Sequence, residues 1–246
     1  MPRRLNSTTL LSILQPWSEV AEPIYRRVAR LADAEPGRET LWIGCGAGRS
    51  VLWWCERFKT LTEGVDPELE AIEEADKSAR REGLTKLTTF QVADPTDLPH
   101  EDQVFDTVVV HMLHLPSPRG KEVIREAGRV ARPMAPVIAI APSWLQTPSD
   151  KDVAIVENLG MSPQLAVEWK GFFREAGIVE LSVEAAAGDG RWILQKTLAL
   201  IVRGWRAAGW SGVRTVMGRH VRGLRRLARK RVLGLSVVKG TRWPHG

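Results

Sequence analysis

Three glycines and one aspartate are the residues of this chain with the clearest chemical meaning. Gly44, Gly46 and Gly48 follow a short apolar run and form a Gly-x-Gly-x-Gly turn. Glycine has no Cβ, so the backbone of such a turn can approach a ligand closely. Asp66 ends the next apolar run, at close to the roughly 20-residue spacing that a strand, turn, helix and strand require. A carboxylate there can accept hydrogen bonds from both ribose hydroxyls, so the pattern predicts a nucleoside-binding half-domain.

The elements that must position these residues alternate between helical and strand patterns. Because the strand runs are apolar throughout, they indicate a parallel sheet that is covered on both faces. The expected strands are at about 40–44, 61–65, 87–92, 105–111 and 137–141. The expected helices are at about 17–31, 48–58, 67–83 and 119–131, the third opening at Pro67 and ending at Gly83.

The pattern changes in the second half of the chain. Residues 162–177 are expected to be helical and residues 178–185 to form a strand. Residues 191–231 are typical of two helices, and residues 233–239 of a last strand. A strand separated from its partner by helices predicts a final hairpin with a helical insertion. The predicted fold class is therefore α/β, with a seven-stranded, mostly parallel sheet whose last strand is antiparallel.

Charge and cysteine content narrow the class of protein. The net charge is +6, yet Asp189 is the last acidic residue and fourteen Lys and Arg follow it. The residues up to Asp189 hold 21 basic against 29 acidic side chains, so an acidic body carries a basic tail. Two cysteines exclude a disulfide framework and a thiol-rich metal site, so we expect no metal and a reducing, cytoplasmic location. No apolar run approaches the roughly 20 residues of a membrane span.

Six segments, taken in order, resemble the class I S-adenosylmethionine-dependent methyltransferases, in particular the small-molecule group that includes quinone methyltransferases. They are LWIGCGAG at 41–48, GVDP at 64–67, VADPTDLP at 92–99, FDTVVVHMLHLP at 105–116, REAGRVARP at 125–133 and FFREAG at 172–177. The resemblance covers about residues 40–185. It implies that family's Rossmann-like fold and S-adenosyl-L-methionine as cofactor. A hydride-transferring Rossmann domain fits less well, because it needs Gly-x-Gly-x-x-Gly spacing and Gly48 comes one residue early.

The resemblance also assigns roles to individual residues. The backbone at residues 44–46 would face the carboxypropyl end of the cofactor. Asp66 would bind the ribose diol, and Asp94, with the backbone at Pro95, would hold the adenine. The full cofactor set is Gly44, Cys45, Gly46, Gly48, Asp66, Pro67, Asp94, Pro95 and His111.

The sequence departs from the family pattern at Trp42, where the family has an acidic residue that helps to hold the methionine end of the cofactor. The turn before the fifth strand is also unusual, with Met134 and Ala135 in place of two glycines.

Two histidines are candidates for a general base. His111 ends the fourth strand, near where the family places the transferred methyl group, and His114 lies in the turn that follows. Either imidazole could take a proton from an acceptor. Each could equally be a packing or surface histidine. The chemistry does not require a base, because the cofactor's sulfonium already activates the methyl group.

The basic tail has three interpretations. Residues 211–231 combine an apolar stripe with eight Lys and Arg residues, as in an amphipathic helix. Such a helix could pack on the domain with its cations in solvent, lie on an anionic membrane surface at the inner face, or bind a phosphate backbone. Nucleic acid is the less favoured partner, because the body is acidic and no RNA-binding module is recognisable.

The prediction is methyl transfer to a small, apolar or anionic acceptor. The alternatives are an RNA methyltransferase that uses the basic C-terminal helices and a degenerate cofactor-binding protein without activity. The expected organisation is an N-terminal helical cap at 1–39, a cofactor-binding domain at 40–189 and 232–246, and a basic helical insertion at 190–231. The oligomeric state is left open.

Overall fold

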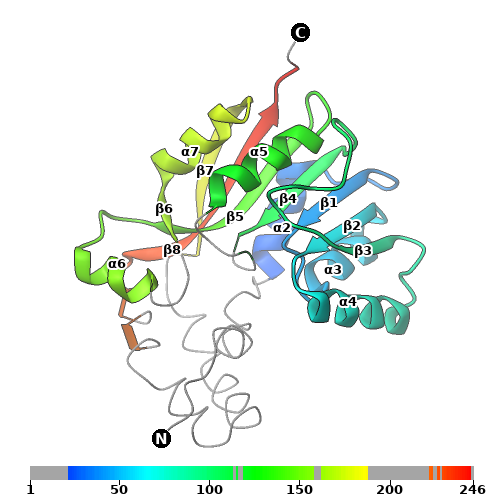
Figure 1. The fold of residues 1–246 in the computed structure, drawn as a ribbon, viewed down its shortest axis with the longest axis horizontal. Helices are drawn as coiled ribbons and strands as arrows, with labels where there is room; N and C mark the ends of the chain where they lie inside the picture. The colour runs from blue at the N-terminus through cyan, green and yellow to red at the C-terminus, as the bar shows by residue number, and fades with distance from the viewer. Residues whose placement is uncertain are drawn as a thin grey trace, which may run out of the picture.

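The computed structural model describes residues 22–112, 115, 119–157, 162–187, 222–223, 226–227 and 229–244. These residues form a sheet with helices on both faces (Figure 1). The helices are α2 (Glu22–Ala32), α3 (Arg49–Phe58), α4 (Leu69–Glu82), α5 (Gly120–Val130), α6 (Asp150–Glu157) and α7 (Ala166–Glu175). The strands are β1 (Glu39–Ile43), β2 (Leu61–Asp66), β3 (Thr88–Val92), β4 (Thr107–His111), β5 (Pro136–Trp144), β6 (Gln164–Leu165), β7 (Ile178–Ala187) and β8 (Leu233–Arg242).

The sheet has the order β3-β2-β1-β4-β5-β8-β7, with β6 paired to β5 off this path. Strands β1 to β5 run parallel, and β8 lies antiparallel between β5 and β7. The predicted α/β class and the antiparallel last strand are confirmed. The main path has the seven strands expected, and the two-residue strand β6 is an addition. Because β1 and β4 are neighbours where the strand order reverses, a crevice at their carboxyl ends is the place where such sheets bind ligands.

The alternation of side chains along β1 divides the core into two layers. Leu41 and Ile43 face α5 and α7, while Trp42 faces α2 and α3. All three side chains are fully buried. The sheet is therefore covered on both faces, as its apolar strands require.

The helices differ from the sequence expectation in three places: the start of α4, the presence of α6, and the start of α7. Residues 162–177 were expected to be helical, but Gln164 and Leu165 pair with β5 as β6, so α7 begins at Ala166. The helix expected from Pro67 begins at Leu69, because the Asp66 side chain accepts a hydrogen bond from the Glu68 backbone N–H at 3.1 Å and holds Pro67 in a turn. It ends as expected at Gly83, which has φ of +70°. Helix α6 was not expected. The Asp152 carboxylate caps it by accepting hydrogen bonds from the Ser149 hydroxyl at 2.7 Å and backbone N–H at 3.2 Å.

The predicted N-terminal cap and helical insertion lie largely outside the described residues. Helix α2 is the helix of the cap that the structure describes. It packs on the face of the sheet to which the Trp42 side chain points. Within the part of the chain that the structure describes, no helix has the length and apolarity to cross a membrane.

Candidate active site

The glycine turn follows β1 and is held against the end of β2. The backbone N–H groups of Gly44 and Cys45 both donate to the carbonyl of Val65, at 2.8 and 3.0 Å. The N–H of Gly46 donates to the carboxylate of Asp66 at 2.8 Å. The turn and the aspartate are thus one hydrogen-bonded unit, although 20 residues separate Gly46 from Asp66.

Two of the three glycines are required by close approach as well as by conformation. Gly44 has φ of +75°, and a Cβ there would lie 2.8 Å from the carbonyl oxygen of His111. Gly48 has φ of +76°, and its Cβ would lie 2.7 Å from the Cβ of Ala75. Gly44 therefore joins the turn to the end of β4, and Gly48 lets α3 begin against α4. The third glycine, Gly46, supplies the N–H that Asp66 accepts.

Asp66 is a buried acidic group of the site. Its side chain is 2% exposed, and it accepts hydrogen bonds from the N–H groups of Gly46 and Glu68 through different oxygens. Burial raises the pKa of its carboxyl to about 6, although the two backbone donors oppose the shift. No cationic side chain of the described residues forms a salt bridge with it. Each oxygen keeps a lone pair, so this carboxylate fits a ligand that offers hydroxyl donors.

An open hollow of about 350 Å³ lies beside Asp66, at the ends of β2 and β3. It is lined by Pro67, Val92, Ala93, Asp94, Pro95, Thr96 and Arg119. Oδ1 of Asp94 accepts hydrogen bonds from the backbone N–H and the hydroxyl of Thr96, at 2.8 and 2.7 Å. Asp94 therefore forms the turn before Pro95, as its sequence position suggests, and its other oxygen, Oδ2, lies toward Arg119 at 3.4 Å.

The two candidate bases differ in what the structure describes. His111 is fully buried at the end of β4, and its carbonyl oxygen lies against Gly44. His114 lies outside the described residues. Leu115, the residue after His114, is also buried and approaches Gly44, since a Cβ on that glycine would lie 3.0 Å from the Leu115 side chain.

Trp42 is a core residue in this structure. It is fully buried, with its ring 6.1 Å from that of Tyr25 on α2 and 5.5 Å from that of Trp54 on α3. The position that carries a carboxylate in the related family thus fastens α2 and α3 to the sheet. Cys45 is also buried, and burial raises the pKa of its thiol well above the usual range, so its contribution to the turn is its backbone.

The structure brings most of the predicted residues to one edge of the sheet. Asp66 is the last residue of β2. Just beyond β1 lie Gly44 and Gly46, and just beyond β3 lies Asp94. These strands run parallel and end side by side. Sequence reasoning missed Thr96 and Arg119, which hold Asp94 in place. One signal in the sequence could have pointed to such residues. Pro95 has no backbone N–H to offer a ligand, so a neighbouring side chain would have to supply the donor.

These residues fit a nucleoside cofactor. The turn lacks Cβ atoms where a side chain would fill the crevice, and the buried Asp66 carboxylate has oxygens ready for hydroxyl donors. The hollow beside it is bordered by the apolar side chain of Val92, which is 44% exposed, and by the carboxylate of Asp94. Among the described residues, no cluster of His, Cys, Asp and Glu side chains could hold a metal ion.

Comparison with known proteins agrees with this geometry. A family model described as a methyltransferase domain matches residues 41–134. Methyltransferase GfsG of Streptomyces halstedii is 30% identical over 124 residues, which make up 50% of this chain and 44% of that protein. The chain therefore spans less than half the length of this relative.

Solved structures show the same fold. Phosphoethanolamine N-methyltransferase 2 of Haemonchus contortus, in complex with phosphomonomethylethanolamine and S-adenosylhomocysteine, matches with a TM-score of 0.75 at 14% identity, covering 99% of this chain and 59% of that one. The cyclase SpnF matches with a TM-score of 0.75 at 20% identity, covering 91% and 80%. At such identities the likeness concerns the fold alone. The methyltransferase-domain match thus covers residues 41–134, and the sheet around it has the Rossmann-like fold of these methyltransferase structures.

Proposed function

We propose that this protein transfers a methyl group from S-adenosylmethionine to a small-molecule acceptor. The observation that carries the proposal is the hydrogen-bonded unit of the glycine turn and the buried Asp66 carboxylate, next to the hollow that Asp94 borders. The family match over residues 41–134 supports it. The match of the cyclase SpnF is a reminder that this fold serves more than one reaction, so activity must be measured directly.

Each part of the site has a separate task in binding. The carboxylate of Asp66 would accept hydrogen bonds from the ribose hydroxyls through the lone pairs that Gly46 and Glu68 leave free. The backbone at residues 44–46 would face the carboxypropyl end. Trp42 has no carboxylate, and its ring is buried in the aromatic core. It therefore cannot bind the cofactor's amino group. Asp94 and the neighbouring Pro95 would hold the adenine in the hollow.

The cofactor, when bound, supplies a methyl group that its positively charged sulfur has already activated for nucleophilic attack. The chain then needs to hold the acceptor in line and exclude water. His111 and His114 are the proposed candidates for a base that receives the acceptor's proton. The burial of His111 means that an acceptor would have to reach it inside the protein. A test replaces each histidine with glutamine: loss of a pH-dependent limb of kcat/KM in one variant would identify the base.

An apolar or anionic acceptor remains part of the proposal. Support for such an acceptor comes from the ten tryptophans of the chain and from its basic tail. Two of these tryptophans are too buried to line an open acceptor site: Trp144 is 8% exposed, and Trp169, 1% exposed, donates to the Pro142 carbonyl at 3.3 Å. The comparisons do not favour the alternatives of an RNA methyltransferase or a degenerate protein.

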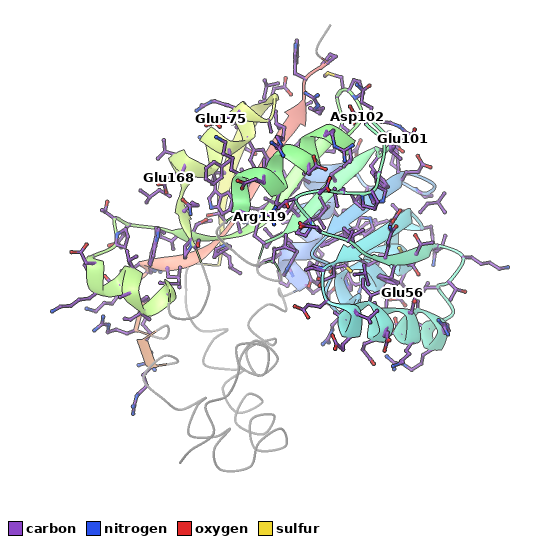
Figure 2. The ribbon with its side chains drawn as sticks, in the orientation of Figure 1. Glu56, Glu101, Asp102, Arg119, Glu168 and Glu175 are labelled. Carbon is purple, nitrogen blue, oxygen red and sulfur yellow. The ribbon has the colours of Figure 1, made fainter. Side chains whose placement is uncertain are left out.

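Calorimetry with S-adenosylhomocysteine tests the central claim on the full chain. We expect binding by the wild type and a loss of at least about tenfold in affinity for Asp66→Ala, since a charge-assisted hydrogen bond contributes about 1.5–3 kcal/mol. Glu101→Ala, which removes an exposed carboxylate elsewhere, should bind as the wild type does (Figure 2). Absence of binding up to millimolar ligand would refute the proposal. Transfer of labelled methyl groups to a panel of fatty acids, quinols and RNA then separates the acceptor classes.

Peripheral contact with an anionic membrane through residues 211–231 is a second part of the proposal. At the described end of this segment, Leu227 is fully buried against Trp144, Val156 and Leu233. Arg226 pairs with Asp152 of α6 at 3.3 Å. These contacts favour packing of this end on the domain.

The cations that remain at this end are Arg222, Arg229, Lys230 and Arg231, all exposed. A membrane contact made here would therefore be electrostatic. Cosedimentation with anionic vesicles should fall as salt rises, and it should fall with Lys230→Glu/Arg231→Glu but not with Arg80→Glu/Arg81→Glu on α4. Equal effects of both double variants, or binding to neutral vesicles, would refute this surface.

A further inference from the structure

Arg119 contributes a cationic side chain to the lining of the hollow beside Asp66. It lies at the start of α5, near the centre of the view in Figure 2. Its guanidinium donates to Asp94 Oδ2 at 3.4 Å and forms a short hydrogen bond with the Thr96 hydroxyl. Arg119, Thr96 and Asp94 thus form one polar group at the edge of the hollow.

The two oxygens of Asp94 are used unequally. Oδ1 accepts two hydrogen bonds from Thr96, at 2.7 and 2.8 Å. Among the described residues, Oδ2 is in contact with Arg119 alone, at a distance near the outer limit for a hydrogen bond. The Thr96 hydrogen bonds, with Arg119 nearby, keep the pKa of Asp94 below its usual range. Asp94 therefore presents an ionised oxygen that can accept a further donor.

Hydrogen-bond donors are scarce in the same place. Pro95 has no backbone N–H, the N–H of Thr96 is taken by Asp94, and the N–H of Ala93 donates to the Asp66 carbonyl at 3.2 Å. A guanidinium carries five N–H groups, and the contacts to Asp94 and Thr96 account for two of them. Among the described side chains that line the hollow, Arg119 is the one with donors to spare.

We propose that Asp94 and Arg119 together read the Watson–Crick edge of the cofactor's adenine. That edge offers a donor, the N6 amino group, beside an acceptor, N1. Asp94 Oδ2 accepts from the amino group, and Arg119 donates to N1 in place of the N–H that Pro95 lacks. Arg119 is then a specificity-determining residue for the cofactor. This inference rests on the proposed function, since it assumes that the nucleoside occupies this hollow.

Binding of modified nucleosides tests the assignment without measuring turnover. The ligands are S-adenosylhomocysteine, its 1-deaza analogue, in which N1 is replaced by C–H, and its inosine analogue, which presents an acceptor at position 6 and a donor at N1. Calorimetry on the full chain compares the wild type with Arg119→Ala and with Arg125→Ala, an exposed arginine on the same helix. Thermal unfolding verifies that each variant is folded.

A hydrogen bond of this kind is expected to change affinity by about tenfold or more. The wild type should therefore bind the 1-deaza analogue about tenfold more weakly than S-adenosylhomocysteine, and the inosine analogue more weakly still. Arg119→Ala should lose the same factor for S-adenosylhomocysteine and nothing for the 1-deaza analogue. Arg125→Ala should behave as the wild type does.

Two results would overturn the inference while leaving the proposed function intact. In one, Arg119→Ala binds S-adenosylhomocysteine as tightly as the wild type. In the other, it weakens both ligands by the same factor, which would mean that Arg119 only supports the Asp94 turn. Failure of the wild type to bind S-adenosylhomocysteine at all would instead refute the proposed function.

Discussion

Replacing Asp66 with asparagine should remove a loss of stability that the wild type undergoes as the pH rises to neutrality, although it damages the proposed cofactor site. The wild-type carboxylate is 2% exposed and no described cation pairs with it, so burial favours its protonated form. Asparagine has nearly the same shape but no charge. Gly46 and Glu68 donate to different oxygens of Asp66, so the amide replaces one of the two acceptors by a donor. This cost is the same at every pH and does not affect the pH dependence.

The size of the effect follows from the pKa. Burial raises the pKa of Asp66 from 3.8 to about 6, and two units correspond to about 3 kcal/mol. Since the folded-state pKa is the higher one, the protonated group stabilises the fold. This contribution is fully present below the unfolded pKa of 3.8 and is lost as the pH rises through 6.

Urea unfolding of both proteins measures this directly. Between about pH 4.5 and about pH 7.5, the wild type should lose about 2 kcal/mol of unfolding free energy relative to Asp66→Asn. Other carboxylates cancel in the difference as long as they are far from the site. Parallel stability curves for the two proteins over this range would refute the reasoning.

Three other substitutions, two of them with a control variant, test the packing around the site. Trp42→Asp should lower the free energy of unfolding in urea by more than about 4 kcal/mol, because it removes a buried ring and leaves a buried charge. The control, Trp243→Ala, changes a residue that is 47% exposed and should cost less than about 1 kcal/mol. Gly44→Ala should lower the melting temperature and weaken S-adenosylhomocysteine binding, because a Cβ would lie 2.8 Å from a carbonyl oxygen at φ of +75°. In contrast, Gly171→Ala, in open space within α7, should stabilise by up to about 1 kcal/mol. Arg129→Ala should destabilise the fold by about 2–4 kcal/mol, because it leaves the buried Glu126 carboxylate without its ion-pair partner. It also removes the donor to the carbonyls of His100 and Leu98, which accept at 2.7 and 3.0 Å. An unchanged urea midpoint would contradict that role.

Much of the fold could be predicted because its signals are local. The apolar run before Gly44 and the glycine at 83 marked a strand and a helix end within one or two residues of their observed places. Helix α6 was missed, yet Ser149 and Asp152 have the spacing of a helix N-terminal capping box. A short helix with little periodicity is recognisable from its cap more than from its apolar face.

The candidate site was predictable to the extent that it lies on motifs. The glycine turn and Asp66 meet because each follows a strand, and parallel strands end at one edge. The role of Trp42 was not predictable, because its burial depends on Tyr25 of α2 and on Trp54 of α3. A departure from a family pattern indicates that something has changed, but only the neighbouring side chains show what has replaced it.

The sequence by itself determined the order of strands and helices, the glycine turn and the acidic residues at the strand ends, because these depend on periodicity and on backbone conformation over a few residues. The tertiary structure decided the charge state of Asp66, which results from burial by the surrounding core. It also decided the partner of Asp94, since Arg119 approaches from 25 residues away. Desolvation and long-range hydrogen bonds depend on which segments the fold brings together, and no local pattern records them.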